Sequence, residues 1–344
     1  MRGYIRWIAV ALLLVPLRGR EIDLLWRNPG NVARLDLADG PGGRAGRPKP
    51  PFRFVAEDVS GTSPKVTVQD SAGRKWSVKW GKEAWPSTFS SHLAWACGYF
   101  AETEYFVARG RIFGAHDLRR ARDEIAPDGT FEDARFQLRS SSPKFLKDRN
   151  WAWNDNPFLG THEFNGLRIL MMLLSNWDAK DERQFRQRWY EKVVDPHGKA
   201  ADSNLAIFEE SGNPPRYLFF VSDWGATMGK ASNLAGRRDK WNARHFTRQT
   251  AAFVRGVDDN GQVEFSFRGK NGRDISQGIT VSDVRWLMHY LGRISDAQIT
   301  RALVASGATP DQVSFFGPAL RQRIRELQAV ANTRPRQIRE AALR

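Results

Sequence analysis

Two aspartates end apolar runs of the sequence, at positions where a carboxylate can do chemistry. Asp178 follows the longest apolar segment, EFNGLRILMMLLSNW, and Lys180 comes two residues later within NWDAKD. Asp223 ends the strand-like run YLFFVSD, and Asn204 opens the strand-like run before it. If these two strands form a hairpin, both carboxylates and the amide meet at one sheet edge. Such oxygen ligands suit a hard divalent cation, Mg²⁺ or Mn²⁺, that holds phosphate oxygens.

A cation and a small polar turn in the first half add a second set of candidates. Lys79 lies in a strand-like run, and the turn SGTS contains Ser60, Gly61, Thr62 and Ser63. Backbone amides of so small a turn can approach a phosphate group closely. The plainer alternatives are a solvated lysine on an edge strand, as Lys75 and Lys82 recur nearby, and a turn that binds nothing.

The elements that must position these residues follow from alternation and turn signals. Three short strands, joined by turn-rich segments, predict an antiparallel meander, and an apolar stripe at helical spacing follows them. Two more strand-like runs complete a small sheet by about residue 140. The meander strands are expected at 52–58, 65–70 and 75–81, and the helix at 86–98.

The second half has a different character, since it begins with the apolar helix expected over 163–177. Two strands follow, at 204–208 and 216–225, and the pattern is helical from Thr280 onward. An α+β fold with a sheet-rich first part and a mainly helical second part is therefore predicted. The predicted units are a signal peptide or N-terminal anchor (1–20), an irregular N-terminal segment (21–51), a first lobe (52–145), a second lobe (146–332) and a basic tail (333–344).

The start of the chain resembles a secretory signal. Arg2 and Arg6 precede the apolar run WIAVALLLVPL, which is too short to cross a bilayer as a helix. The sequence predicts export to the periplasm or the outside of the cell, with an uncleaved anchor as the alternative and no stable transmembrane span.

Composition narrows the partners and excludes several classes of protein. The formal net charge of +15 and the pI near 10.3 favour polyanionic partners, such as nucleotides, phosphorylated ligands or nucleic acid. A single cysteine, Cys97, excludes an intramolecular disulfide. The six histidines lack paired metal spacing, and neither a GxSxG elbow nor a GxxxxGK[ST] loop occurs.

The order of these motifs resembles that of protein-kinase-like folds. NWDAKD is similar to a kinase catalytic loop, and SDWG is similar to the metal-binding Asp-Phe-Gly turn, with Trp224 in place of phenylalanine. The likeness is to atypical kinases: HipA-like, phosphoinositide-kinase-like and spore-coat (CotH-like) or secretory-pathway kinases. The segments KPPF, NPFLGT, NWDAKD and DWGA also resemble a family of exported bacterial proteins.

The resemblance implies a two-lobed fold, with a small antiparallel-sheet lobe and a mainly helical lobe, that binds ATP and Mg²⁺ or Mn²⁺ between them. Its implied roles are phosphate binding by Lys79, catalysis by Asp178 with Lys180, and metal binding by Asn204 and Asp223. A kinase lysine needs a glutamate partner, but none occurs between Pro86 and Gly98. Three glutamates nearby stay open as that partner: Glu83, Glu102 and Glu104.

Three functions follow as alternatives. The first is ATP-dependent phosphotransfer to an acidic or phosphorylated acceptor, because the surface is basic. The second is an inactive pseudokinase-like module that binds an anionic ligand or partner. The third is nucleic-acid binding, since GRRDKWNARHFTRQ interleaves basic and aromatic residues; the kinase resemblance makes this segment an activation or substrate loop instead.

Overall fold

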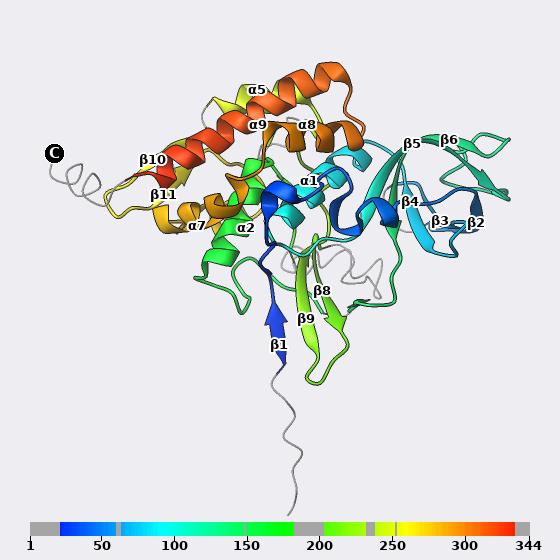
Figure 1. The fold of residues 1–344 in the computed structure, drawn as a ribbon, viewed down its shortest axis with the longest axis horizontal. Helices are drawn as coiled ribbons and strands as arrows, with labels where there is room; N and C mark the ends of the chain where they lie inside the picture. The colour runs from blue at the N-terminus through cyan, green and yellow to red at the C-terminus, as the bar shows by residue number, and fades with distance from the viewer. Residues whose placement is uncertain are drawn as a thin grey trace, which may run out of the picture.

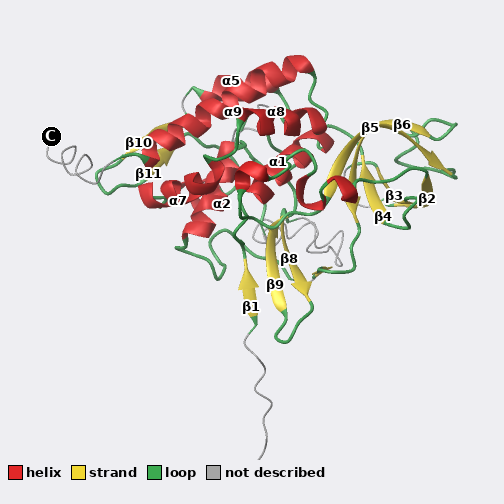
Figure 2. Ribbon diagram, viewed as in Figure 1, coloured by secondary structure: helices red, strands yellow, loops and turns green. Residues whose placement is uncertain are grey.

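The structure is a computed structural model, and its chain folds as a strand barrel joined to a larger, mainly helical part (Figures 1 and 2). It describes residues 21–59, 63–147, 149–181, 203–231, 238–251 and 253–333. The predicted signal peptide or N-terminal anchor over 1–20, the turn residues Ser60, Gly61 and Thr62, and all of the basic tail but Thr333 lie outside the described residues. The α+β class predicted from the sequence is confirmed.

Five strands close into a barrel at one end of the molecule. The predicted meander is present, and its strands join the two later ones in the order β2-β3-β4-β6-β5, with β5 and β2 closing the barrel in parallel. The interior is apolar and aromatic, with Trp76, Val78 and Phe136 fully buried. The strands are β2 (Phe52–Glu57), β3 (Lys65–Gln69), β4 (Lys75–Lys79), β5 (Glu104–Phe113) and β6 (Thr130–Leu138).

The helix α1 (Ala84–Ala96) separates the barrel from the rest of the molecule. Phe89 and Leu93, on its apolar side, are buried in the large core, while Ser87 and Ser91 are buried against the barrel. Small hydroxyl side chains allow this side of the helix to approach charged barrel residues and to hydrogen-bond with them.

The segment predicted as irregular, 21–51, contains one short strand and packs into the core. Strand β1 (Ile22–Leu24) pairs in parallel with β9, and Leu25, Val32 and Leu37 are buried. Three short 3₁₀ turns (Val32–Arg34, Gly40–Gly42 and Arg44–Gly46) then cross α1 and reach the barrel. Glycine and proline content correctly indicated irregular backbone, but it does not show whether sparse leucines are buried.

The helical part is built around α2 (His162–Leu173), whose residues from Phe164 to Leu173 are all buried. Beside it, the sheet β1-β9-β8-β7 contains the predicted hairpin of β8 and β9. The remaining elements are β7 (Lys144–Phe145), β8 (Leu205–Glu210), β9 (Arg216–Val221), α5 (Ala243–Thr250), β10 (Val254–Val257), β11 (Val263–Phe265), α6 (Gly272–Ser276), α7 (Val281–Leu291), α8 (Asp296–Ala305) and α9 (Pro310–Ala331).

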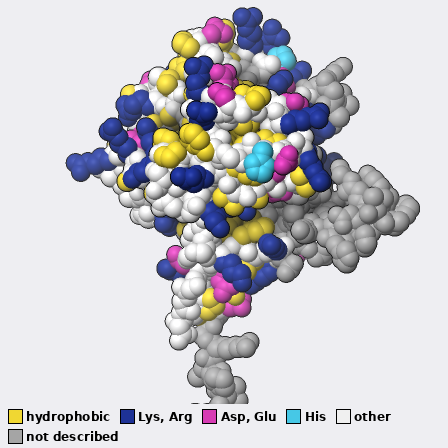
Figure 3. Space-filling model, turned by 90° about the vertical axis from the view of Figure 1, so that its right-hand side faces the viewer, with side chains coloured by type: hydrophobic (Ala, Val, Ile, Leu, Met, Phe, Trp, Pro, Cys, Tyr) yellow, Lys and Arg dark blue, Asp and Glu magenta, His cyan; other side chains and the backbone are white. Residues whose placement is uncertain are grey.

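The surface and the helix lengths bear on partners. Figure 3, which views the barrel end, shows Lys and Arg side chains spread over that face among fewer acidic ones, as the net charge of +15 implies. No helix within the described ranges is long and apolar enough to cross a membrane.

One buried cation holds the end of α2 in place. Arg323 of α9 is 1% exposed, and its guanidinium donates to Leu173 O and Ser175 Oγ at 2.8 Å each. It also donates to Phe246 O at 3.2 Å and lies over the Phe246 ring. Burial lowers the pKa of Arg323 to about 9. Because the last carbonyls of a helix lack internal donors and carry partial negative charge, this cation fixes the loop that leads to Asp178.

We expect Arg323→Ala to lower the free energy of unfolding by about 3 kcal/mol or more, because several buried acceptors lose their donor at once. Urea unfolding followed by circular dichroism measures this. The control is Arg325→Ala, two residues along the same helix, where the exposed side chain donates to Gln322 and the expected change is within about 0.5 kcal/mol. Equal effects of the two substitutions would contradict this role.

Candidate functional site

Lys79 and Glu83 form the ion pair on which the site is built. Lys79 ends β4, and its Nζ lies 2.6 Å from Glu83 Oε2 at the start of α1. Gly81, with φ +92°, makes the tight turn between them. Of the three glutamates that the sequence left open, Glu83 is therefore the partner of Lys79.

The same carboxylate holds a second lysine from the other half of the chain. Lys240 Nζ lies 2.6 Å from Glu83 Oε1. Partial burial by itself would raise the pKa of Glu83, but Lys79 and Lys240 outweigh it and hold the pKa at about 2. Glu83 is thus ionised at neutral pH and joins β4, α1 and the segment that precedes α5.

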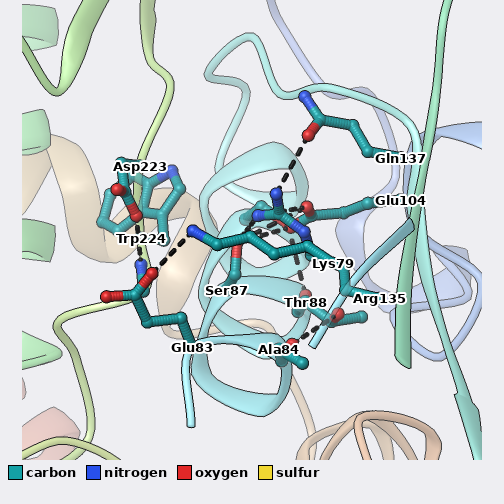
Figure 4. A network of polar contacts seen from close by, with 12 residues as sticks. Lys79, Glu83, Ala84, Ser87, Thr88, Glu104, Arg135, Gln137, Asp223 and Trp224 are labelled. Carbon is teal, nitrogen blue, oxygen red and sulfur yellow. Dashed lines mark hydrogen bonds and ion pairs between the residues drawn. The ribbon is translucent and has the colours of Figure 1, made fainter. Parts of the chain in front are cut away.

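The Asp223 turn packs against this pair. Asp223 Oδ1 accepts a hydrogen bond from Gly225 N at 2.7 Å, and Figure 4 shows the turn beside Glu83 and Lys79. A Cβ placed on Gly225 would lie 2.9 Å from Glu83 Cβ, so only glycine permits this approach. Trp224 is 3% exposed, and its Nε1 has no acceptor among the residues described. Lys79, Glu83 and the Asp-Trp-Gly turn at Asp223 therefore lie next to one another.

Asp178 lies in the loop after α2, and its carboxylate is paired with two lysines. Its Oδ1 lies 2.5 Å from Lys270 Nζ, and its Oδ2 lies 3.8 Å from Lys180 Nζ. The sequence placed Lys180 beside Asp178 but gave no signal for Lys270, which arrives from the connection between β11 and α6. Both oxygens of the Asp178 carboxylate are therefore engaged in ion pairs.

Two asparagines tie the Asp178 and Asp223 loops together. Asn176 Oδ1 accepts from Asp178 N at 3.3 Å, and its Nδ2 donates to Asp223 O at 3.4 Å. Asn204 Nδ2 donates to Asp178 O, and Asn204 O accepts from Ser222 N at 2.9 Å. The predicted convergence of the two aspartates and Asn204 is present in the backbone, although these residues lie far apart in the sequence.

A buried second ion pair lies next to Lys79 on the barrel. Arg135 of β6 is directly opposite Lys79 of β4, so both cations project from the same face of the sheet. Arg135 Nη1 lies 3.2 Å from Glu104 Oε2, and Glu104 also accepts from Ser91 Oγ at 2.5 Å (Figure 4). Like charges directly opposite each other are destabilising, and here Lys79 is paired with Glu83 and Arg135 with Glu104. Sequence reasoning missed Arg135, because cross-strand register was needed to find it.

The small polar turn before β3 is only partly described. Ser60, Gly61 and Thr62 lie outside the described residues, whereas Ser63 is included. The end of this turn runs beside Lys79, because Lys65 is its cross-strand neighbour and Trp80 N donates to Pro64 O at 3.3 Å. Ser63 is thus close in the backbone to the Lys79 strand end, as a phosphate-binding turn requires.

The donor set suits a magnesium ion shared with phosphate better than an all-protein metal site. Asp223 supplies a carboxylate, and Asn204, with Nδ2 directed to Asp178 O, has its amide oxygen as the remaining ligand atom. Within the described ranges no three His, Cys, Asp or Glu side chains cluster in a metal-binding arrangement. Mg²⁺ commonly takes one or two protein carboxylates and completes its shell with substrate phosphates and water, so a carboxylate and an amide oxygen are ligand types that suit it.

Comparison with known proteins finds no relative of this chain: no family model, no curated protein and no solved structure matches it.

Glu102 gives the site a pH dependence that can be measured. Burial and the neighbouring Glu104 raise its pKa to about 7 from 4.5, with a smaller contribution from Asp223. The folded protein therefore holds the proton of the Glu102 carboxyl group more tightly than the unfolded chain does. The contribution of this bound proton to the stability of the fold is complete below about pH 4.5 and is lost as pH rises through 7.

We expect Glu102→Gln to be more stable than the wild type at pH 8 by roughly 1–3 kcal/mol and equally stable at pH 4.5. Urea unfolding at both pH values measures the difference. Glu132→Gln, at an exposed barrel position, is the matched control and should show no such pH dependence. A Glu102→Gln effect of the same size at both pH values would rule out the raised pKa.

Proposed function

We propose that this protein is an atypical kinase-like protein, in which the barrel is the small lobe and the helical part is the large lobe. Its cleft would bind a nucleoside triphosphate with Mg²⁺ or Mn²⁺. The observation that carries the proposal is the Lys79–Glu83 pair at 2.6 Å, packed against the Asp223 turn. A strand lysine paired with a glutamate, beside a metal-binding Asp-x-Gly turn, is the arrangement on which kinases depend.

The order of the parts along the chain supports the same proposal. The β2–β3 turn comes first, then the lysine strand β4, α1, the buried helix α2 with the Asp178 loop, and the β8–β9 hairpin with Asp223. A lysine, a catalytic-loop aspartate and an Asp-x-Gly turn in this order match the kinase parts. Asn204 departs from the pattern because it follows Asp178 much later than in the kinase motif, yet it bonds to Asp178 O.

Each side chain then has a role that its position allows. Lys79, held by Glu83, would bind the α- and β-phosphates, and Asp223 with Asn204 would bind the metal, which supplies positive charge to the phosphate oxygens when bound. Amides of the turn from Ser60 to Ser63 would face the phosphates. Asp178 would accept the proton of an acceptor hydroxyl, and Lys180 would stabilise the charge of the transferring phosphoryl group.

One observation favours a second candidate, a binding module that does not transfer phosphate. The Asp178 carboxylate contacts Lys270 at 2.5 Å as well as Lys180. A general base needs a free lone pair near the proton that it takes, and both oxygens of this carboxylate contact lysines. The protein would then retain nucleotide or another anion in the cleft without catalysis.

We expect saturating MgATP to raise the melting temperature of the purified protein by about 5 °C at a hundredfold excess over Kd. Asp223→Ala should abolish this shift, because the metal loses its carboxylate ligand. Asp259→Ala, an exposed aspartate in the β10–β11 turn, is the matched control and should keep the full shift. Differential scanning fluorimetry measures all three proteins.

The result against the proposal is a wild-type protein that shows no shift with ATP or GTP and either metal ion. A shift that Asp223→Ala leaves intact would place the nucleotide elsewhere. A wild-type protein that binds MgATP but neither hydrolyses nor transfers its γ-phosphate would favour the second candidate.

A further inference from the structure

A cavity of about 390 Å³ lies next to the proposed cleft, between the start of α1, residues 238–242 and the start of α9. Three cationic side chains line it: Lys82, Arg238 and Lys240. Trp85 and Trp241 give it apolar walls. A volume of this size suits a small molecule or a single side chain.

Two of these cations are not engaged by carboxylates. Lys82 is exposed and has no ion-pair partner among the residues that the structure describes. Arg238 stacks on Trp177, with its guanidinium carbon 4.6 Å from the ring centroid, and likewise forms no ion pair in the described part of the chain. Lys240 contacts Glu83, but Glu83 also balances Lys79, so this trio carries a net positive charge.

The one carboxylate in the lining does not cancel this charge. Asp239 is turned to its own neighbours, since its Oδ2 contacts His245 Nδ1 and its Oδ1 accepts from Lys230 N. Three cations against this one carboxylate leave the lining with a net positive charge, and an anion is the ligand that it would attract.

The cavity adjoins both halves of the proposed catalytic machinery. Trp177, the residue before Asp178, donates from Nε1 to Asp239 O at 2.8 Å and carries Arg238 on its ring. On the other side, Lys240 reaches the Lys79–Glu83 pair. A ligand in the cavity thus lies beside the loop that contains the predicted base.

We propose that this cavity binds a phosphate monoester group carried by a small-molecule acceptor. That this molecule is an acceptor rests on the proposed phosphotransfer function. That it carries a phosphate monoester rests on the cavity alone. The planar guanidinium of Arg238 matches two phosphate oxygens, Lys82 adds a point charge, and the tryptophans accommodate an apolar or planar part of the molecule.

The test is isothermal titration calorimetry of the full chain with O-phospho-L-tyrosine, a planar phosphate monoester, and with L-tyrosine. We expect the phosphate ester alone to bind. Lys82→Glu and Arg238→Gln should each weaken it about tenfold or more, because each removes a charged contact. Lys75→Glu, an exposed lysine on β4, is the control and should leave the affinity within about twofold.

Three results would overturn the proposal. One is the absence of binding while the MgATP melting shift is intact, which removes the cavity assignment and leaves the nucleotide site standing. The second is binding of L-tyrosine with the same affinity as the ester. The third is that Lys82→Glu and Arg238→Gln weaken the binding of a single-stranded oligonucleotide but not the binding of the ester. Binding of the ester without any MgATP shift would support the cavity and remove the nucleotide proposal, so the two failures are distinguishable.

Discussion

The arrangement of the site depends on one partly buried carboxylate that is shared by two lysines. Glu83 lies where the barrel, α1 and the second half of the chain meet, and it contacts Lys79 and Lys240 at 2.6 Å each. If Glu83 lost its charge, two cations would face each other in a partly desolvated place, which is costly. Its pKa of about 2 reflects how strongly both lysines favour the ionised form. One side chain thus holds together segments more than 150 residues apart.

The helical part of the molecule holds the loop that contains Asp178 in place. Arg323 binds the last carbonyls of α2, and Asn176 then joins Asp178 to Asp223 through its amide. Because each of these groups is held by neighbours that are themselves buried, the loop positions are set by packing and not by the loop sequence alone. Lys270, from the connection between β11 and α6, contacts Asp178 in the loop that is held in this way.

The cleft and the cavity beside it share their electrostatics. Lys240 belongs to both, since it lines the cavity and contacts Glu83. An anion in the cavity would draw Lys240 away from Glu83 and leave Glu83 entirely to Lys79. Anion binding in the cavity and nucleotide binding in the proposed cleft would then be coupled through Lys240, and linkage would make that coupling reciprocal.

Much of the fold was predictable because its signals are local. Alternation found the strands from Phe52 to Lys79, and the apolar run before Asp178 found α2. Closure of the barrel, the burial of Leu25 and Leu37, and the Arg135–Glu104 pair depend on which strands and helices meet, and no local pattern encodes that. At the site, the apolar runs located Asp178 and Asp223. Lys270 is a single lysine in a polar segment, and Lys240 lies in the basic and aromatic run GRRDKWNARHFTRQ, but nothing in either segment indicated the carboxylate that its lysine contacts.

A double-mutant cycle tests the central claim most directly, that Glu83 positions Lys79 for a nucleotide. The dissociation constant of MgATP is measured for the wild type, Lys79→Met, Glu83→Gln and the double variant. We predict that both single variants bind more weakly and that the double variant is little worse than Lys79→Met. This corresponds to a coupling energy of about 1 kcal/mol or more. Effects that add within about 0.5 kcal/mol, or affinities that no variant changes, would contradict the account.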